Sequence, residues 1–273
     1  MAFTGTSILV ATDLSPRCDR AVDRAMMLAQ EWQTRLKVLH VPDAAPKGKA
    51  SAEPGEDAVR ATLPDPQADV DILLRTGSLP KVLAETAVEA DSGLIVTGVA
   101  RFNNLRDFIL GTAVDYIIRH AQAPVLVVKQ RPHAHYRTVL VATDLSETSR
   151  AALLRAAALF PHARLHLVHA AQMPYEKWLD SDQARVELQA DARHRLDRFL
   201  AHPEISPDLR HRVQLQIGYG EIGAVINMAL EETRADLLVL GTVGAGGLRH
   251  ATLGSTAASL LAWVPVDALM VRG

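Results

Sequence analysis

Short apolar runs alternate with longer amphipathic segments along the first half of the chain. The runs carry almost no charge and are apolar on both faces, as a parallel sheet buried between two layers of helices requires. They are Ile8–Ala11, Leu36–Val41, Val70–Arg75, Leu94–Thr97 and Val125–Val128. Between the first two runs, Arg17–Trp32 carries apolar residues at helical spacing behind Ser15–Pro16, a typical helix start. This half of the chain therefore predicts five strands linked by crossover helices.

The second half shows the same alternation. Its apolar runs are Val139–Ala142, Leu165–His169, Val213–Ile217, Leu237–Leu240 and Ala268–Val271. The whole pattern predicts an α/β protein made of two doubly wound, five-stranded parallel-sheet domains. One wide sheet is the alternative, and an internal repeat favours two domains.

The repeat is visible in identical residues. LVATDLS occurs at Leu9–Ser15 and again at Leu140–Ser146, and GLIVTG ending at Gly98 is similar to DLLVLG ending at Gly241. The separation grows from 131 residues at the first pair to 143 at the second, so the second half holds an insertion, which we assign to the charged helical stretch Ser181–Leu200. We therefore predict domains at residues 1–131 and 136–273.

Composition narrows the classes of partner. The chain has 273 residues, a net charge of −2 and a single cysteine, Cys18. This charge gives no general reason to expect binding to nucleic acid or to a membrane surface. One cysteine excludes an internal disulfide and a zinc site built from several cysteines. No signal peptide and no long apolar segment is recognisable, so we expect a soluble, cytoplasmic protein.

Two aspartates, Asp13 and Asp144, directly follow the first strand of each half. Ligands of open parallel sheets bind beyond the carboxyl ends of the strands, where such a carboxylate accepts hydrogen bonds from a ribose or a base amino group. The alternative is a structural aspartate that shapes the turn or caps the next helix.

A glycine-rich run, GTVGAGGLRHATLGST, follows the fourth strand of the second half from Gly241 to Thr256. Glycines let backbone amides approach an anion, and Gly254, Ser255 and Thr256 precede an apolar helix whose N-terminus favours phosphate. The spacing is neither that of a Walker loop nor that of a dinucleotide-binding motif. A glycine loop without a ligand is the alternative.

Gly241-x2-Gly244-x9-Gly254-Ser255 resembles the nucleotide loop of the universal stress protein family, and the ATD segments and Gly77 and Gly218 after the third strands are also similar to that family. The resemblance covers nearly all of both halves and implies a tandem universal stress protein that binds ATP, ADP or AMP, with Mg²⁺ accompanying the phosphates. It implies a nucleotide site in the second half, composed of Ala142, Thr143, Asp144, His169, Ala170, Gly218, Gly241, Gly244, Arg249, Gly254, Ser255 and Thr256.

The first half departs from this pattern, because Arg101 stands where the second half has Gly244. A side chain there restricts the backbone and fills space that a phosphate would occupy. We therefore expect nucleotide binding chiefly in the second half, and regard the first half as the weaker candidate. Its corresponding residues are Ala11, Asp13, Val41, Gly98, Gly111 and Thr112.

Binding a nucleotide does not imply its hydrolysis, which needs charge neutralisation and a positioned water. No common hydrolase motif occurs, so we expect a regulator in stress response with no catalytic residue and at most weak ATPase activity. A slow ATP-hydrolysing enzyme and an interaction module for another ligand or a protein are the alternatives.

The last strand of each half, Val125–Val128 and Ala268–Val271, is expected at a sheet edge. An uncovered apolar edge invites pairing with another strand. In the family such strands pair between domains, so we expect the two halves to form an internal pseudo-dimer that could itself form a homodimer.

Overall fold

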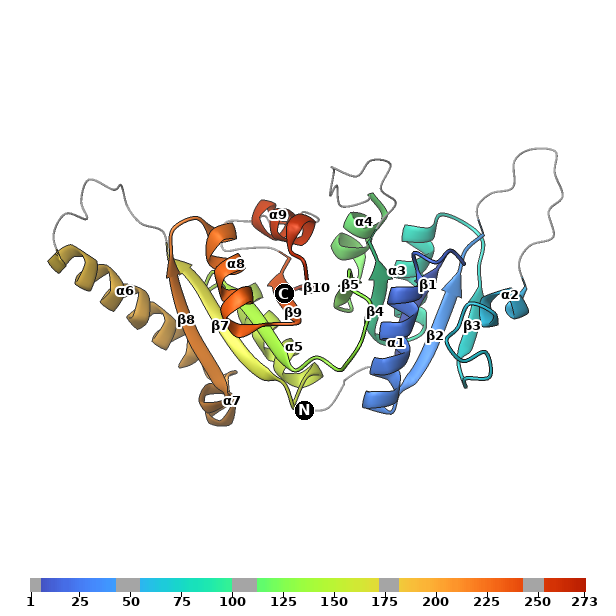
Figure 1. Cartoon of the computed structure of the whole chain (residues 1–273), viewed down its shortest axis with the longest axis horizontal. Coiled ribbons are helices and arrows are strands. Elements are labelled where there is room, and N and C mark those ends of the chain that lie inside the picture. Colours follow the sequence, from blue (N-terminus) through green and yellow to red (C-terminus); the bar gives the residue numbers. More distant parts are fainter. Residues whose placement is uncertain (1–5, 43–54, 100–111, 172–181, 243–252) are drawn as a thin grey trace.

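The computed structural model describes residues 6–42, 55–99, 112–171, 182–242 and 253–273 (Figure 1). Strands and helices alternate along the chain in both halves. The first half contains β1 (Ser7–Thr12), α1 (Asp19–Trp32), β2 (Arg35–His40), α2 (Glu56–Arg60), β3 (Asp71–Leu74), α3 (Leu79–Glu89), β4 (Ser92–Gly98), α4 (Thr112–His120) and β5 (Val125–Val128). The second half contains β6 (Thr138–Thr143), α5 (Glu147–Leu159), β7 (Arg164–Ala171), α6 (Asp182–Leu200), α7 (Pro207–Arg212), β8 (Val213–Tyr219), α8 (Ile222–Thr233), β9 (Leu237–Gly241), α9 (Ser255–Trp263) and β10 (Asp267–Val271).

All ten strands form one sheet in the order β3-β2-β1-β4-β5-β10-β9-β6-β7-β8. Each half contributes five parallel strands, which confirms the doubly wound fold predicted from sequence. The halves meet where β5 pairs with β10 in the antiparallel direction. Two five-stranded units and one wide sheet, which the sequence left as alternatives, are therefore both present (Figure 1).

Helices cover both faces of the sheet. Apolar residues of α1, α2, α5, α6 and α7 pack on one face, and those of α3, α4, α8 and α9 pack on the other. Strand β1 is buried along its whole length, as expected for a strand covered on both sides. The inserted stretch is helix α6, whose Leu196 and Phe199 lie in the same core cluster as Val139 of β6. That helix therefore covers the sheet.

The two halves are related by an approximate two-fold axis through their shared edge. Val128 pairs with Gly98 in the first half, and Val271 pairs with Gly241 in the second, so Val128 and Val271 occupy equivalent positions. Leu126 lies two residues before Val128, and Leu269 lies two residues before Val271. These two leucines lie directly opposite one another in the antiparallel β5–β10 pair. The halves are thus paired as two copies of one chain would be in a symmetric dimer.

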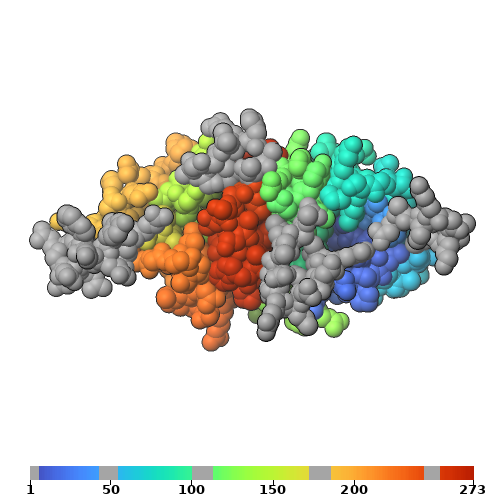
Figure 2. Space-filling view, turned by 90° about the horizontal axis from the view of Figure 1, so that it is seen from above, coloured from blue at the N-terminus to red at the C-terminus, as the bar shows by residue number. Residues whose placement is uncertain are grey.

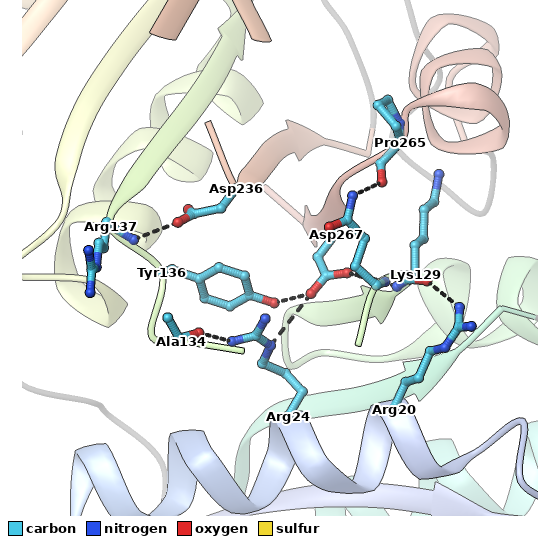
Figure 3. Close-up of polar contacts among 10 residues, drawn as sticks. Arg20, Arg24, Lys129, Ala134, Tyr136, Arg137, Asp236, Pro265 and Asp267 are labelled. Carbon is cyan, nitrogen blue, oxygen red and sulfur yellow. Dashed lines mark hydrogen bonds and ion pairs between the residues drawn. The ribbon is translucent and has the colours of Figure 1, made fainter. Parts of the chain in front are cut away.

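A buried aspartate departs from this symmetry at the seam between the halves (Figure 3). Asp267 is 1% exposed, and its Oδ1 accepts hydrogen bonds from the backbone N–H groups of Lys129 at 2.7 Å and Gln130 at 3.0 Å. Its Oδ2 accepts a hydrogen bond of 2.5 Å from the hydroxyl of Tyr136. The position equivalent to Asp267 in the first half is occupied by Pro124.

Arg24 of α1 completes this group. Its Nε lies 3.5 Å from Asp267 Oδ2, and its guanidinium lies 4.1 Å from the centre of the Tyr136 ring. It also donates a hydrogen bond of 2.8 Å to the carbonyl oxygen of Ala134 in the connecting segment. Burial and the negative charge of Asp267 raise the pKa of Tyr136, which keeps its hydroxyl protonated as a donor. The connection between the halves is therefore fixed by buried polar contacts as well as by strand pairing.

Among the described helices, none combines the length and the apolar character needed to cross a lipid bilayer.

Candidate functional site

A cavity of about 370 Å³ lies at the carboxyl ends of β6, β7 and β9. This is the edge of a parallel sheet at which ligands are expected, and the volume is typical of small-molecule sites. One part of its lining is apolar and comes from the strand ends and from α8 and α9. These residues are Ala142, Val168, Ala170, Ile222, Ile226, Leu240, Ala257 and Leu260. The polar part consists of Thr143, Asp144, Ser146, Ser149, Gly241, Gly254, Ser255 and Thr256.

Asp144 lies at the rim because a tight turn ends β6. Its Oδ1 accepts a hydrogen bond of 3.0 Å from the backbone N–H of Ser146, and Thr143 Oγ1 accepts one from Leu145 N–H. Leu145 has a φ of 67°, a left-handed conformation that costs free energy in a residue with a side chain. The first half repeats this turn, with Leu14 at a φ of 61°. The strained turn therefore belongs to the repeat and not to the cavity alone.

Three hydroxyl groups lie next to the Asp144 turn. Thr143 Oγ1 and Ser149 Oγ are 2.8 Å apart, and Ser149 Oγ donates to the carbonyl oxygen of Ser146 at 2.9 Å. Ser146 caps α5 by accepting a hydrogen bond from Ser149 N–H. Ser146 and Ser149 are not among the site residues predicted from the sequence. Their spacing at the start of a helix, directly after the aspartate turn, was the available signal.

The N-terminus of α9 forms the opposite polar wall. Gly254 is the residue before the helix, and its N–H donates to the carbonyl oxygen of Thr242 at 2.7 Å. Ser255 and Thr256 are exposed in the first turn. The first amides of a helix have no partner within the helix and carry partial positive charge, so this wall is suited to an anionic group.

Two residues selected from the sequence do not line this cavity. His169 and Ala170 are consecutive on β7, so their side chains point to opposite faces of the sheet. Ala170 lines the cavity, whereas His169 is buried on the other face, with Nδ1 2.9 Å from the carbonyl oxygen of Thr143. At Gly218 on β8, a Cβ atom would overlap Val225 of α8. Close packing therefore accounts for this glycine.

The structure places the other selected residues of the second half in two groups. Ala142, Thr143, Asp144, Gly241, Gly254, Ser255 and Thr256 all line the cavity with Ala170. Gly244 and Arg249 lie outside the described residues. A Cβ atom at Gly241 would lie 2.9 Å from Thr148 Cγ2, so α5 approaches the strand end closely there.

The first half has bulkier residues at several equivalent positions. Val41 stands where the second half has Ala170, and Val114 where it has Ala257. Helix α3 packs directly against α4, whereas α8 and α9 make little direct contact and both line the cavity. Among the described residues, α3 and α4 are therefore packed together at the place where α8 and α9 both line a cavity.

The remaining residues selected in the first half lie in different surroundings. Ala11 is buried in the core, Asp13 is exposed, and Gly98 ends β4. Thr112 is the first residue of α4, and Gly111 and Arg101 lie outside the described residues.

Asp144 is the single ionisable side chain in the described part of the cavity lining. Nowhere in the described ranges do three or more His, Cys, Asp or Glu side chains gather in an arrangement that could hold a metal ion. At the edge of the site, Glu221 accepts a hydrogen bond of 2.8 Å from Ala224 N–H and caps α8. The backbone N–H groups of Gly223 and Ala224 lower the pKa of the Glu221 carboxyl, which keeps it ionised.

Comparisons with known proteins agree with the repeat. A curated protein of Staphylococcus aureus (strain USA300), provisionally named as a universal stress protein, is 28% identical over 164 residues, covering 53% of this chain and 97% of the relative. The crystal structure of a functionally unknown protein from Pseudomonas aeruginosa PAO1 superposes with a TM-score of 0.68 at 22% identity, covering 99% of this chain and 93% of that one.

A universal stress protein from Archaeoglobus fulgidus DSM 4304 superposes with a TM-score of 0.63 at 18% identity, over 99% of this chain and 97% of that one. Both superpositions span the two halves together, so this tandem arrangement is shared. The model of the universal stress protein family matches residues 6–129 and again residues 135–272. The chain therefore belongs to the universal stress protein family and carries two copies of its domain.

Proposed function

We propose that the chain binds one adenine nucleotide, in the cavity of the second half, and acts as a nucleotide-responsive regulator in stress response. The observation that carries this proposal is that a single cavity combines the Asp144 turn, an apolar floor and the N-terminus of α9. A nucleotide has the matching parts, namely a flat apolar base, a ribose with hydroxyl groups, and a charged phosphate.

The roles follow from the chemistry of each wall. The aliphatic side chains of Val168, Ile226 and Leu260 would contact the base, and the Asp144 carboxylate would accept hydrogen bonds from the ribose hydroxyls. The amides and hydroxyls at Ser255 and Thr256 would receive the phosphates. Mg²⁺ prefers oxygen ligands and is commonly bound by one or two carboxylates together with substrate phosphates. With Asp144 as the one carboxylate of the described lining, Mg²⁺ binding would depend mainly on the phosphates themselves.

The first half is proposed as a unit without a nucleotide. Val41 and Val114 fill the space that Ala170 and Ala257 leave open in the second half, and α3 and α4 are in direct contact. Calorimetric titration of the whole chain with ATP should therefore give one nucleotide per chain.

The test transfers the first-half residues into the cavity. The double variant Ala170→Val and Ala257→Val should weaken ATP binding about fivefold or more, because overfilling a packed site costs on the order of 1–3 kcal/mol. Ala190→Val, at an exposed position on α6, is the matched control and should bind as the unmodified chain does. Equal affinity in all three proteins would refute the assigned cavity.

Titrations with ADP, AMP and adenosine, each with and without Mg²⁺, should rank the contribution of the phosphates. Release of inorganic phosphate from ATP, measured over hours, distinguishes a binding protein from a slow ATPase. Mass spectrometry of the natively purified chain would identify a different ligand if one occupies the cavity.

A further inference from the structure

Helix α9 connects the cavity to the seam between the halves. Its N-terminal residues Ser255 and Thr256 line the cavity. At its other end, the carbonyl oxygens of Leu261 and Val264 accept hydrogen bonds of 2.5 and 2.7 Å from Nζ of Lys129. Lys129 directly follows β5, so the first half supplies the group that holds this helix end.

Lysine is suited to this position because the last carbonyl groups of a helix lack partners and carry partial negative charge. Helix α9 has no basic residue in its own last turn. Its sequence continues through Val264 and Pro265, without a glycine that could form a C-terminal capping turn. The ammonium group of Lys129 therefore provides the C-terminal stabilisation that α9 does not obtain from its own sequence.

The cavity makes this support important. In the first half α4 packs against α3, but in the second half the cavity separates α9 from α8. Ala257 and Leu260 of α9 line the cavity, and Trp263 near the end of α9 lies close to Gly223 of α8. Besides its buried residues Ala257, Leu260 and Leu261, α9 is held by polar attachments at its two ends. These are Gly254 N–H to the carbonyl oxygen of Thr242 and Lys129 Nζ to the C-terminal carbonyls.

Lys129 is itself held by the polar group of the seam (Figure 3). Its backbone N–H donates to Asp267, and its carbonyl oxygen accepts a hydrogen bond of 2.8 Å from Arg20 of α1. The charged or titratable side chains of this seam are Asp267 of β10, Arg20 and Arg24 of α1, and Tyr136 of the connecting segment. Helix α1 also carries Asp19, Asp23 and Glu31, whereas α9 carries no charged side chain. Burial lowers the pKa of Lys129 to about 8, and Asp267 acts in the opposite direction.

Figure 2 shows α9, in red, in the middle of the molecule between α8 in orange and α4 in green. An equivalent contact exists on the other side of the two-fold axis. Arg272 follows β10 as Lys129 follows β5, and its Nη1 donates to the carbonyl oxygen of Arg119 near the end of α4 at 3.3 Å. Helix α4 belongs to the half that we propose to bind no nucleotide, so Arg272 offers a matched control.

We infer that Lys129 is a positioning residue for the nucleotide site, through which the first half holds α9 in place for the second. This inference rests on the proposed function for its ligand. It assigns a role to the first half, which supports a site without forming one.

The experiment measures the affinity of the whole chain for ATP by calorimetry at pH 7.5. Lys129→Met should weaken binding about tenfold, the order expected when a partly buried cation is removed from a helix C-terminus. Lys129→Arg should restore most of the affinity, because a guanidinium also donates to carbonyl oxygens. Arg272→Met should bind ATP as the unmodified chain does. Equal weakening by Lys129→Met and Arg272→Met would overturn the inference, since it would indicate a general loss of stability.

The dependence of ATP affinity on pH is a second readout. If only the bulk of the Lys129 side chain mattered, the affinity would not follow the protonation of its amino group. Lys129 is mostly protonated below a pKa of about 8 and neutral above it. The affinity of the unmodified chain should therefore fall severalfold between pH 7 and 9.5, whereas Lys129→Arg should stay flat because arginine keeps its charge. Parallel profiles in the two proteins would overturn the inference.

Hydrogen exchange separates this inference from the proposed function. If the chain bound no ATP, the proposed function would fail. The exchange rates of the backbone amides of Ser255–Trp263 would then still test the role of Lys129. Faster exchange of α9 than of α4 in Lys129→Met, relative to the unmodified chain, would support the positioning role. Unchanged exchange of α9 would refute it.

Discussion

Asp267 Oδ2 lies 3.5 Å from Arg24 Nε, and both side chains are almost completely buried. The pair joins a helix of the first half to a strand of the second. Because Asp267 also accepts hydrogen bonds from Lys129, Gln130 and Tyr136, the negative charge has several partners besides Arg24. Such a charge is stabilising only while the whole set is intact.

Replacing Asp267 with alanine should be strongly destabilising. Arg24 and the Tyr136 hydroxyl would remain buried without their partner, and the backbone N–H groups of Lys129 and Gln130 would lose their acceptor. The expected cost is about 3–5 kcal/mol in the free energy of unfolding. Urea unfolding followed by circular dichroism measures this loss. The control is Asp71→Ala, which removes a pair at 3.2 Å between exposed Arg35 and Asp71 and should cost at most about 1 kcal/mol. Similar losses in the two variants would contradict the assigned role of the seam.

Gly218→Ala tests whether packing explains this glycine. The new methyl group would overlap Val225, so the free energy of unfolding should fall by about 1–3 kcal/mol. In Gly218→Ala with Val225→Ala, the loss should be smaller than the sum of the two single losses, because the overlap is relieved. The ATP affinity of folded Gly218→Ala should be unchanged. A large loss of affinity without destabilisation would instead indicate a direct role in binding.

Cys18 should react slowly in the folded protein. Burial raises the pKa of its thiol to about 12, and it is the only cysteine in the chain. At pH 8 the thiolate fraction is then about 1000-fold lower than for an unhindered thiol, and only the thiolate reacts. Labelling with a disulfide reagent should therefore still accelerate about tenfold per pH unit between pH 8 and 9.5. In urea the labelling rate of Cys18 should be high and should become independent of pH above about pH 9. A labelling rate that also became independent of pH in the folded protein would contradict the raised pKa of Cys18.

Gln33→Gly should stabilise the protein. Gln33 ends α1 with a φ of 50°, and its side chain is exposed. Glycine adopts this left-handed conformation without the penalty of a Cβ atom, so the free energy of unfolding should rise by about 0.5–1 kcal/mol. Gln189→Gly, at an exposed position inside α6, should lower it by about 1 kcal/mol. Thermal melting of both variants gives the comparison, and a lower melting temperature for Gln33→Gly would disprove the explanation.

The sequence was sufficient for the fold and for selecting several residues that line the cavity. The repeated apolar runs predicted the five strands of each half, and the uncovered last strands predicted the pairing of β5 with β10. The segment containing Asp144 and the glycine-serine segment at Gly254 do face one cavity, because both follow strands of the same sheet at the same edge.

The neighbouring residues His169 and Ala170 show what strand geometry indicates from sequence alone. Residues alternate between the two faces of a strand, so the side chains of His169 and Ala170 were to be expected on opposite faces of the sheet, and in the structure Ala170 lines the cavity while His169 does not. By contrast, the contact of Lys129 with α9 joins residues more than 130 positions apart. Neither local pattern nor composition carries information about such a pair. The same holds for the valines of the first half, whose effect depends on how close α3 and α4 approach.

The pairing of Leu126 with Leu269 also has a consequence for synthesis of the protein. The edge strand β5 is complete long before its partner β10, which ends near the C-terminus. At translation rates of about 5–20 residues per second, β5 waits on the order of ten seconds for that partner. During this time an apolar strand, Val125–Val128, lies at the edge of a folded half and is open to pairing with other nascent chains. The seam that unites the finished molecule is thus also an edge that is open to misassembly while the chain is being made.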